Sequence, residues 1–191
     1  MYRLMAKLHW TPRERSIERL LTMQMQNQPG CIRRMVDIGC GPGWLVRTAR
    51  RLGIDYLGAD PAHHGDCDIA GGRIEQRDAL NTIEELKDSD VVILNGVVHH
   101  LDDLTLEKVL CSSKKCAATI ICDHRAEPSN HLVNRILQRL DRGRFIRPWD
   151  YFQSLTGYAS QMLEPFEIRW FGIPIWSYFA GLYLPKDVSD G

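Results

Sequence analysis

Short apolar runs recur along the chain, and each is followed by residues that favour a turn. The first lies around Met35–Ile38 and leads into a glycine-rich stretch, and the second, Tyr56–Ala59, ends at Asp60. The runs Asp90–Asn95 and Ala117–Cys122 contain several β-branched residues. Apolar runs of this length, bounded by turn residues, are typical of strands that are buried on both faces of a parallel sheet.

Segments with a helical spacing of apolar residues separate these runs. Strands that alternate with helices predict an α/β fold with a mostly parallel sheet. After the first strand we expect a helix at Trp44–Leu52, a short third strand at Arg73–Arg77, helices at Thr82–Leu86, Leu104–Leu110, Pro128–Leu140 and 149–156, and a last antiparallel hairpin of Phe166–Phe171 and Ser177–Leu184.

Residues 1–30 read as an N-terminal helical cap. Its start signal is Thr11-Pro12-Arg13-Glu14, with an N-cap threonine, proline at the first helical position and glutamate at the third. Pro29-Gly30 ends the helix. The basic residues Arg13, Arg15 and Arg19 are expected on a solvated face, and a substrate-facing role is the alternative.

Composition narrows the class of protein. At 191 residues the chain fits a single domain. Its 24 basic and 24 acidic residues balance, so no overall field attracts nucleic acid or an anionic membrane. No stretch approaches the ~20 apolar residues that span a bilayer, and the first residues lack the apolar core of a secretory signal. Six cysteines without a C-x-x-C pair favour reduced thiols in a cytoplasmic protein.

The glycine-rich stretch Gly39-Cys40-Gly41-Pro42-Gly43 lies between the first strand and the first interior helix. Strand, glycine turn and helix form the context in which such a loop holds a nucleotide-like ligand. Glycines accept positive φ and let a ligand approach the backbone closely. Dinucleotide-binding folds use G-x-G-x-x-G, whereas the spacing here is G-x-G-x-G with Asp37 two residues earlier, which disfavours a nicotinamide dehydrogenase.

This pattern resembles motif I of the class I, Rossmann-like S-adenosylmethionine-dependent methyltransferases. The resemblance implies a three-layer sandwich around a mostly parallel seven-stranded sheet with a C-terminal antiparallel hairpin, and S-adenosyl-L-methionine as the cofactor. Asp37 suits the cationic amino-acid end of that donor. Residues that the resemblance places at the cofactor are Asp37, Gly39, Cys40, Gly41, Gly43, Asp60, Pro61, Asp78, Ala79 and Asn95.

Two acids later in the chain support this resemblance. Asp60, which ends the second strand, follows Asp37 at close to the ~20-residue spacing expected for an acid that binds the ribose hydroxyls; alternatively, Asp60-Pro61 simply opens a turn. Asp78-Ala79 ends the third strand, where the family has an acid that accepts the adenine amino group. Asp78 can equally cap the next helix.

The run from Asn95 to Asp103, Asn-Gly-Val-Val-His-His-Leu-Asp-Asp, is similar to the N-x-x-H-H-L region of many small-molecule methyltransferases. Ligands of parallel sheets bind at the carboxyl ends of the strands, so His99 and His100 are the candidate catalytic bases. Imidazole titrates near neutral pH and can remove a proton from an acceptor. We expect one of the two to be catalytic and the other structural. His124 is a weaker third candidate, and the two aspartates are expected to cap the following helix.

The segment His63–Asp68 departs from the family pattern, because it is too short for the helix that usually connects these strands. We expect a loop or a single turn there. Its histidines, aspartates and cysteine match no common zinc signature, so no metal is predicted. Late aromatic residues, Trp149, Tyr151, Phe152, Trp170 and Trp176, are candidates to line an apolar acceptor pocket, and Arg142, Arg144 and Arg147 are candidates to meet an anionic group on the acceptor.

The sequence therefore predicts an enzyme that methylates a small molecule, most simply at a hydroxyl group in a biosynthetic pathway. A macromolecular methyltransferase and a catalytically inactive cofactor-binding protein are the alternatives. We expect no nucleic-acid partner and no transmembrane segment. The expected division is one domain, 1–191, with a helical cap at 1–30, a cofactor-binding half at 34–123 and acceptor-side helices and the hairpin at 124–185. The oligomeric state and the acceptor are not specified by the sequence.

Overall fold

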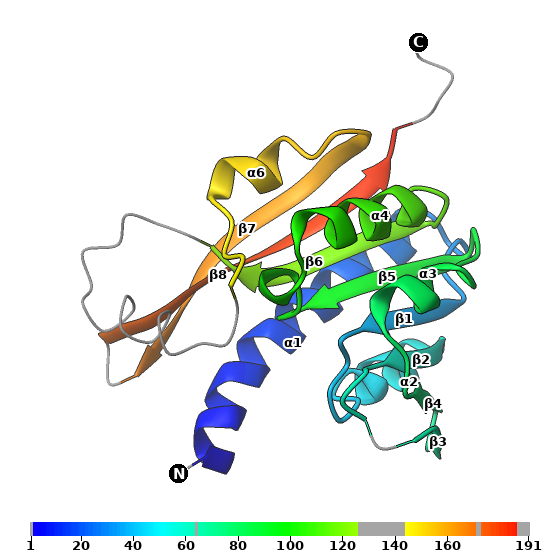
Figure 1. Cartoon of the computed structure of the whole chain (residues 1–191), viewed down its shortest axis with the longest axis horizontal. Helices are drawn as coiled ribbons and strands as arrows, with labels where there is room; N and C mark the ends of the chain where they lie inside the picture. The colour runs from blue at the N-terminus through cyan, green and yellow to red at the C-terminus, as the bar shows by residue number, and fades with distance from the viewer. Residues whose placement is uncertain (1, 64, 126–143, 171–172, 187–191) are drawn as a thin grey trace.

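The computed structural model describes residues 2–63, 65–125, 144–170 and 173–186. These residues form a single eight-stranded sheet with helices on both faces (Figure 1). The strands are β1 (Arg34–Ile38), β2 (Asp55–Ala59), β3 (Cys67–Ile69), β4 (Gly72–Glu75), β5 (Asp90–Asn95), β6 (Ala118–His124), β7 (Tyr158–Trp170) and β8 (Ile173–Pro185). The helices are α1 (Tyr2–Asn27), α2 (Val46–Leu52), α3 (Ala79–Ile83), η1 (Val98–His100, a 3₁₀ turn), α4 (Asp103–Ser113) and α6 (Trp149–Gln153).

The strands lie in the order β3-β4-β2-β1-β5-β6-β8-β7. The five central strands β4, β2, β1, β5 and β6 pair in parallel. The pairs β3–β4, β6–β8 and β8–β7 are antiparallel. The predicted fold class, a mostly parallel sheet with a C-terminal antiparallel hairpin, is therefore confirmed. The parallel strands bring the segments after β1, β2, β4, β5 and β6 to one edge of the sheet.

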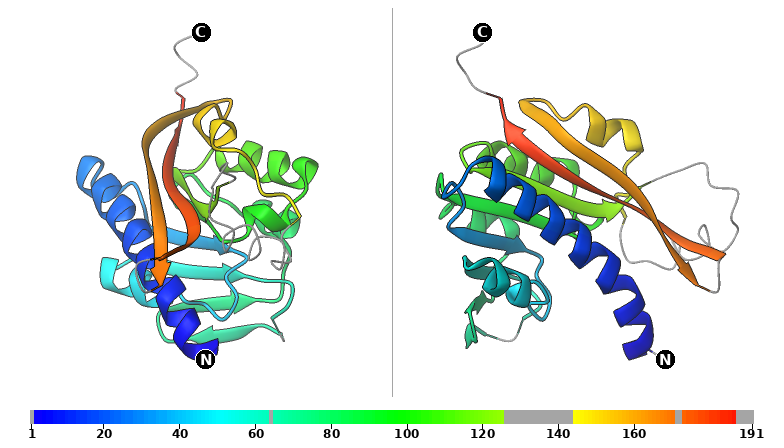
Figure 2. Two further views of the ribbon diagram at one scale, coloured as in Figure 1. Left: turned by 90° about the vertical axis from the view of Figure 1, so that its left-hand side faces the viewer. Right: turned by 180° about the vertical axis from the view of Figure 1, so that it is seen from behind.

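Two apolar clusters fill the two sides of the sheet. On one side α1 and α2 pack against it, with Ile17, Leu20 and Leu45 in the cluster. On the other side α3, α4 and α6 supply residues such as Ile83, Leu106 and Phe152. The views from the side and from behind show α1 crossing one face while α4 covers the other (Figure 2). The three-layer arrangement follows from strands that are apolar on both faces.

Several elements differ from the prediction. The sheet has eight strands rather than seven, because Cys67–Ile69 pairs with Gly72–Glu75 through a two-residue connection in which Gly71 has φ of 98°. The sequence predicts a loop for most of this strand, because three residues are too few to show the alternation of polar and apolar positions that identifies a strand. The third expected strand begins at Gly72 and ends at Glu75, earlier than predicted at both ends.

The N-terminal helix begins at Tyr2 and not at Thr11, so Pro12 lies inside it. Good helix formers such as Leu4, Met5 and Ala6 precede the cap-like sequence and continue the helix upstream. The helix ends at Asn27, just before Pro29-Gly30, as expected. In the final hairpin, β7 begins eight residues earlier than predicted, and β8 begins four residues earlier and ends one residue later. The helix expected at Pro128–Leu140 lies outside the described residues.

Candidate active site

A cavity of about 650 Å³ opens at the carboxyl edge of the sheet. Its walls come from the turn after β1, the ends of β2 and β4 and the segment that follows β5. The lining residues are Ile38, Gly39, Asp60, Pro61, Ala62, Asp78, Ala79, Leu80, Gly96, Val97, His100, Leu101 and Thr105. The structure thus brings together Gly39, Asp60, Pro61, Asp78, Ala79 and His100, all predicted site residues that are far apart in the sequence.

The glycine turn depends on its glycines for two different reasons. Gly39, Gly41 and Gly43 all have positive φ, at 73°, 54° and 75°. A Cβ at Gly39 would lie 2.5 Å from Val97 Cγ2, and one at Gly43 would lie 2.6 Å from Ile74 Cδ1. A Cβ at Gly41 would meet no heavy atom within 4 Å. The first and third glycines therefore allow close packing, whereas Gly41 is required only by its backbone conformation.

Asp60 connects the end of β2 to the glycine turn. Its Oδ2 atom accepts a hydrogen bond of 2.8 Å from the N–H of Gly41, and Oδ1 accepts one of 2.8 Å from the N–H of Ala62. The predicted turn-opening role is thus present. Each carboxylate oxygen has a further lone pair, so the side chain can still accept from hydroxyl groups in the cavity that it lines.

Asp78 caps α3, which was one of its two predicted roles. Its Oδ1 atom accepts a hydrogen bond of 2.8 Å from the N–H of Asn81. The same residue lines the cavity together with Ala79 and Leu80. Asp102 likewise caps α4 by accepting from the N–H of Thr105 at 2.7 Å, as predicted.

Asp37 and Cys40 lie beneath the turn, outside the cavity lining. Asp37 is 2% exposed, and its Oδ2 atom accepts a hydrogen bond of 2.8 Å from the hydroxyl of Tyr56. Burial raises the pKa of Asp37 to about 7; the charge of Asp60 adds to this rise and the Tyr56 hydrogen bond opposes it. Burial raises the pKa of the Cys40 thiol to about 12, so Cys40 is a neutral packing residue.

Two buried polar groups beside the turn have no partner within the described part of the chain: Asp37 Oδ1 and the whole side-chain amide of Asn95. Buried polar groups are normally hydrogen-bonded. Asp37 lies on β1 and Asn95 ends the neighbouring strand β5. A ligand with an ammonium group and further polar atoms would satisfy both. The residues present therefore fit the amino-acid end of S-adenosylmethionine.

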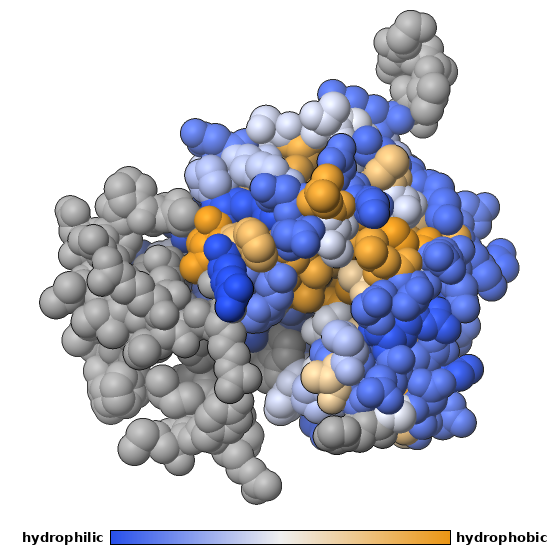
Figure 3. Space-filling model, viewed as in Figure 1, coloured by the Kyte–Doolittle hydropathy of each residue, from blue (hydrophilic) through white to orange (hydrophobic). Residues whose placement is uncertain are grey.

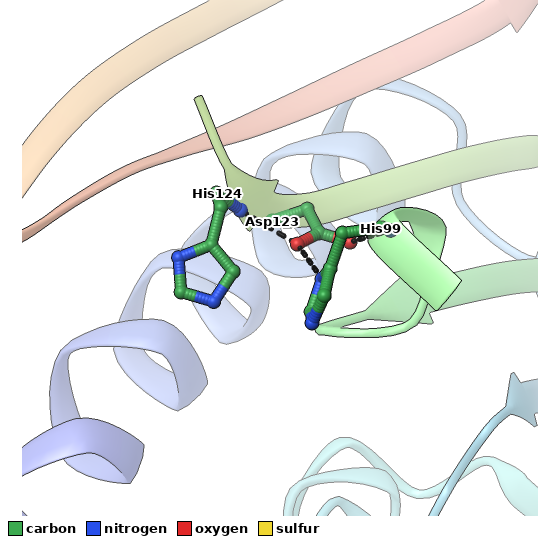
Figure 4. Close-up of side chains that lie close together, drawn as sticks. All are labelled: His99, Asp123 and His124. Atoms are coloured by element: carbon green, nitrogen blue, oxygen red, sulfur yellow. Dashed lines mark hydrogen bonds and ion pairs between the residues drawn. The ribbon is translucent and has the colours of Figure 1, made fainter. Parts of the chain in front are cut away.

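His99 forms a buried pair with Asp123, which follows Cys122 at the end of β6 (Figure 4). Its Nδ1 atom lies 2.5 Å from Asp123 Oδ1, and its backbone N–H donates to Oδ2 at 3.2 Å. The backbone N–H of His124 donates to Oδ1 at 2.6 Å. Burial raises the pKa of Asp123, but the His99 hydrogen bond and the charges of both histidines outweigh it and hold the pKa below its usual value. Asp123 is therefore an ionised acceptor and His99 Nδ1 the donor.

Within the described residues, one cluster could hold a metal ion: His99, Asp123 and His124, whose potential ligand atoms all lie within 4.8 Å of one another. Nevertheless, two nitrogen or oxygen ligands of one tetrahedral zinc ion lie about 3.3 Å apart, given metal–ligand distances of about 2.0–2.1 Å. The 2.5 Å contact is shorter than this and is that of a charge-assisted hydrogen bond. The Nε2 atom of His124 lies 3.1 Å from the hydroxyl of Tyr178. The arrangement is that of a hydrogen-bonded network.

The two predicted catalytic histidines occupy different environments. His99 is 5% exposed, whereas His100 is exposed and lines the cavity. Their ring centres are 4.1 Å apart, and the ring of His124 lies 4.7 Å from that of His99. Sequence reasoning named all three histidines but missed Asp123. The available signal was an acid at the carboxyl end of β6, the strand next to β5, which His99 follows.

Arg147, one of the candidates to meet an anionic acceptor group, holds the histidine segment in place. Its Nη1 atom donates to the carbonyl of Val98 at 2.9 Å, and Nη2 donates to the carbonyl of Leu101 at 2.9 Å and to Asp103 at 2.7 Å. The side chain is buried. Because these carbonyls flank His99 and His100, Arg147 fixes the backbone from which both rings project.

Most of the aromatic residues predicted at an acceptor pocket are packing residues. Phe152 is 1% exposed, and its ring centre lies 4.2 Å from that of Phe179. The ring centre of Trp149 lies 5.5 Å from that of Phe179. Trp176 is also buried, in a small apolar cluster with Ile168 and Tyr178, and its ring centre lies 4.6 Å from that of His124. The side chains of Trp170 and Arg142 lie outside what the structure describes. On the face that carries α4, apolar surface gathers across the middle and polar surface surrounds it (Figure 3).

This fold and site define a class I S-adenosylmethionine-dependent methyltransferase. The glycine turn after β1, the acid at the end of β2, the acid after β4 and the segment after β5 surround one cavity at the carboxyl edge. Residues 8–156 match the model of the methyltransferase domain family, so the chain belongs to this family. The family resemblance and the identity of the methyl donor, both inferred from the sequence, are thereby confirmed.

Among curated proteins, the chain is similar to the ubiquinone biosynthesis O-methyltransferase of Azorhizobium caulinodans, with 40% identity over 83 residues. That match covers 38% of this chain and 32% of the relative. The mitochondrial ubiquinone biosynthesis O-methyltransferase of Bos taurus is 34% identical over 104 residues, covering 46% of this chain and 28% of the relative. The chain thus spans about a third of the length of the curated relatives it matches.

Among solved structures, the plantazolicin methyltransferase BamL, in complex with a triazolic desmethylPZN analog and SAH, has a TM-score of 0.65 at 13% identity. The match covers 97% of this chain and 89% of that one. Human N-acetylserotonin methyltransferase in complex with SAM has a TM-score of 0.63 at 15% identity, covering 93% and 53%. These likenesses show the fold. Within the described residues, no helix has both the length and the apolar character that crossing a membrane requires.

Proposed function

We propose that this protein transfers a methyl group from S-adenosylmethionine to a hydroxyl group of a small molecule, with the buried His99–Asp123 pair removing the hydroxyl proton. The observation that carries the proposal is the 2.5 Å contact between His99 Nδ1 and Asp123 Oδ1. His99 is the chain neighbour of His100, which lines the donor cavity. The relatives named as O-methyltransferases support a hydroxyl acceptor.

The donor, when bound, supplies an electrophilic methyl group on a sulfonium. Asp60, Asp78 and Ala79 line the cavity; Asp60 would accept from the ribose hydroxyls, and Asp78 and Ala79 would hold the adenine. Apolar walls from Leu80, Val97 and Leu101 suit a purine ring.

His99 then acts as the general base. Because Nδ1 donates to the carboxylate of Asp123, the ring takes a proton at Nε2. The buried carboxylate stabilises the imidazolium that forms and fixes the orientation of the ring. Positioned bases typically contribute ~10²–10⁴-fold to rate. His100 is exposed and lines the cavity, and Arg147 fixes the backbone of both histidines.

The test is methyl transfer from isotopically labelled donor to the small molecules of a cell extract, followed by mass spectrometry of the labelled product. A labelled product that is stable to base would be a methyl ether, and one that base hydrolyses would be a methyl ester, so this difference would identify the kind of oxygen that is methylated. His99→Gln should lower turnover at least a hundredfold with unchanged donor affinity, and His100→Gln should not. Transfer of label only to protein or RNA would refute the small-molecule assignment, and loss of turnover on chelation would indicate a metal ion in place of the dyad.

A further inference from the structure

A second cavity lies between α4 and the segment of α6, which covers the same face of the sheet (Figure 1). Its volume is about 520 Å³, within the range of small-molecule sites. It has no lining residue in common with the donor cavity, and α4 lies between the two: Thr105 lines the donor cavity and the opposite flank lines the second one. That flank carries, at helical spacing, Asp103, Glu107, Leu110, Cys111 and Lys114. We call this cavity the α4–α6 groove.

The two ends of the groove differ in charge. Asp103 and Glu107 are about one helical turn apart at the start of α4, and Lys114 is about 16 Å further along the helix axis than Asp103. The ammonium group of Lys114 lies 6.0 Å from the centre of the Tyr158 ring. Because a charge interaction in water is weak at such a separation, Lys114 does not neutralise the two acids.

The acidic end combines negative charge with apolar walls. Glu107 is exposed and takes part in none of the ion pairs within the described part of the chain. Burial raises the pKa of Tyr151; the charge of Arg147 opposes this rise, and the charges of Asp103 and Glu107 add to it. The Tyr151 side chain thus lies close to both acids, and apolar lining from leucine accompanies it. An organic cation with an apolar body matches this combination.

Arg147 connects the acidic end of the groove to the histidine segment. Its Nη2 atom donates to Asp103 at 2.7 Å, and its Cζ atom lies 5.5 Å from the centre of the Tyr151 ring. The same guanidinium donates to the two carbonyls that flank His99 and His100. A cation bound at Asp103 would compete with Arg147 for this carboxylate and would bring a second positive charge close to a buried one. Both effects weaken the hold of Arg147 on the backbone of the two histidines.

We propose that the α4–α6 groove binds a small organic cation, with its ammonium group at Asp103 and Glu107, and that this binding loosens the histidine segment through Arg147. The ligand acts from the flank of α4 that does not line the donor cavity, so the site is separate from the proposed reaction. Turnover should fall when the groove is occupied, because the segment that carries His99 loses part of its support.

Calorimetry with three matched probes tests the binding. Phenylpropylamine is a cation, phenylpropanol is neutral and phenylpropionate is an anion, and all three have the same apolar body. The site variant is Glu107→Gln, which removes the charge and keeps the shape. Glu84→Gln is the matched control, because Glu84 is exposed and does not line the groove. Thermal unfolding without a probe checks that each variant folds.

The amine should bind the wild-type protein about fivefold more tightly than the alcohol, the upper range for an exposed ion pair, and the propionate should bind most weakly. Glu107→Gln should reduce this preference for the amine, and Glu84→Gln should preserve it. Equal affinity for amine and alcohol, no binding of the amine, or the same loss in both variants would overturn the site.

Nitrogen-15 NMR tests the coupling and needs no acceptor. Adding the amine to the wild-type protein should shift the signals of the Arg147 side chain and of the His99 ring. Asp103→Asn should show shifted His99 signals before any amine is added, because Arg147 has already lost its carboxylate partner, and the amine should shift them little further. Binding of the amine with unchanged Arg147 and His99 signals would overturn the coupling.

Discussion

Asp123→Asn tests the proposed base most directly. In the wild-type protein the Asp123 carboxylate accepts from the His99 ring at 2.5 Å and from the backbone of His124 at 2.6 Å. An asparagine amide keeps one acceptor oxygen and presents an N–H₂ group in place of the other. If that group faces His99 Nδ1, the ring proton moves to Nε2, and the ring can no longer accept the hydroxyl proton.

The expected loss of turnover is the whole contribution of a positioned base, ~10²–10⁴-fold, or about 2.7–5.4 kcal/mol. The loss of stability should be smaller, about 1–3 kcal/mol, because Asn preserves shape and one acceptor. A domain stable by about 5–15 kcal/mol remains folded, with a melting temperature lowered by about 2–4 °C for each kcal/mol. Donor affinity should not change, since Asp123 does not line the cavity.

Two measurements decide the matter. Nitrogen-15 NMR of the imidazole rings reports which nitrogen of His99 carries the proton and needs no knowledge of the acceptor. Single-turnover transfer from labelled donor, with the acceptor found in extract, reports the rate. Asp102→Asn is the matched control, because Asp102 is exposed and caps α4, a position that asparagine fills equally well. Turnover of Asp123→Asn within about threefold of wild type would refute the base mechanism, whatever the tautomer.

Three further variants test other parts of the site. Burial raises the pKa of Asp37 to about 7. Because the ionised carboxylate should bind the donor ammonium better, the affinity for S-adenosylhomocysteine should rise between pH 6 and 8 in calorimetry, and Asp37→Asn should flatten that rise. The unliganded fold keeps the Asp37 proton that the unfolded chain releases near pH 3.8, so the contribution of Asp37 to stability should fall as pH rises from about 4 to 7. The stability of the wild-type protein relative to Asp37→Asn should therefore decrease over this range in chemical unfolding. Asp60→Ala should weaken S-adenosylhomocysteine about tenfold in calorimetry, because the variant loses the acceptor for the ribose hydroxyls; a donor affinity unchanged by Asp60→Ala would contradict the ribose role. Arg147→Met should cost about 2 kcal/mol in chemical unfolding through its lost carbonyl hydrogen bonds and lower turnover without weakening the donor, whereas unchanged turnover would show that the histidine segment does not need this support.

Local sequence determined the framework of the cofactor site. The strand of Met35–Ile38, the glycines that follow and the acid at Asp60 are each recognisable within a few residues. An apolar run specifies a buried strand, and positive φ specifies glycine, before any distant contact forms. Parallel strands place their carboxyl ends at one edge, so the position of the cavity also followed from the order of elements.

The tertiary structure alone decided how polar side chains from distant segments pair. His99 and Asp123 are 24 residues apart, and no periodicity links them. Arg147 bonds to carbonyls 46 and 49 residues away, and these backbone groups have no signature in a sequence. Arg13 resembles its exposed neighbour Arg15 in sequence, but the direction in which α1 crosses the sheet turns only one of them toward Gly96. Strand β3 exists because Gly71 reverses the chain onto β4, and a three-residue strand depends for its stability on the partner it finds.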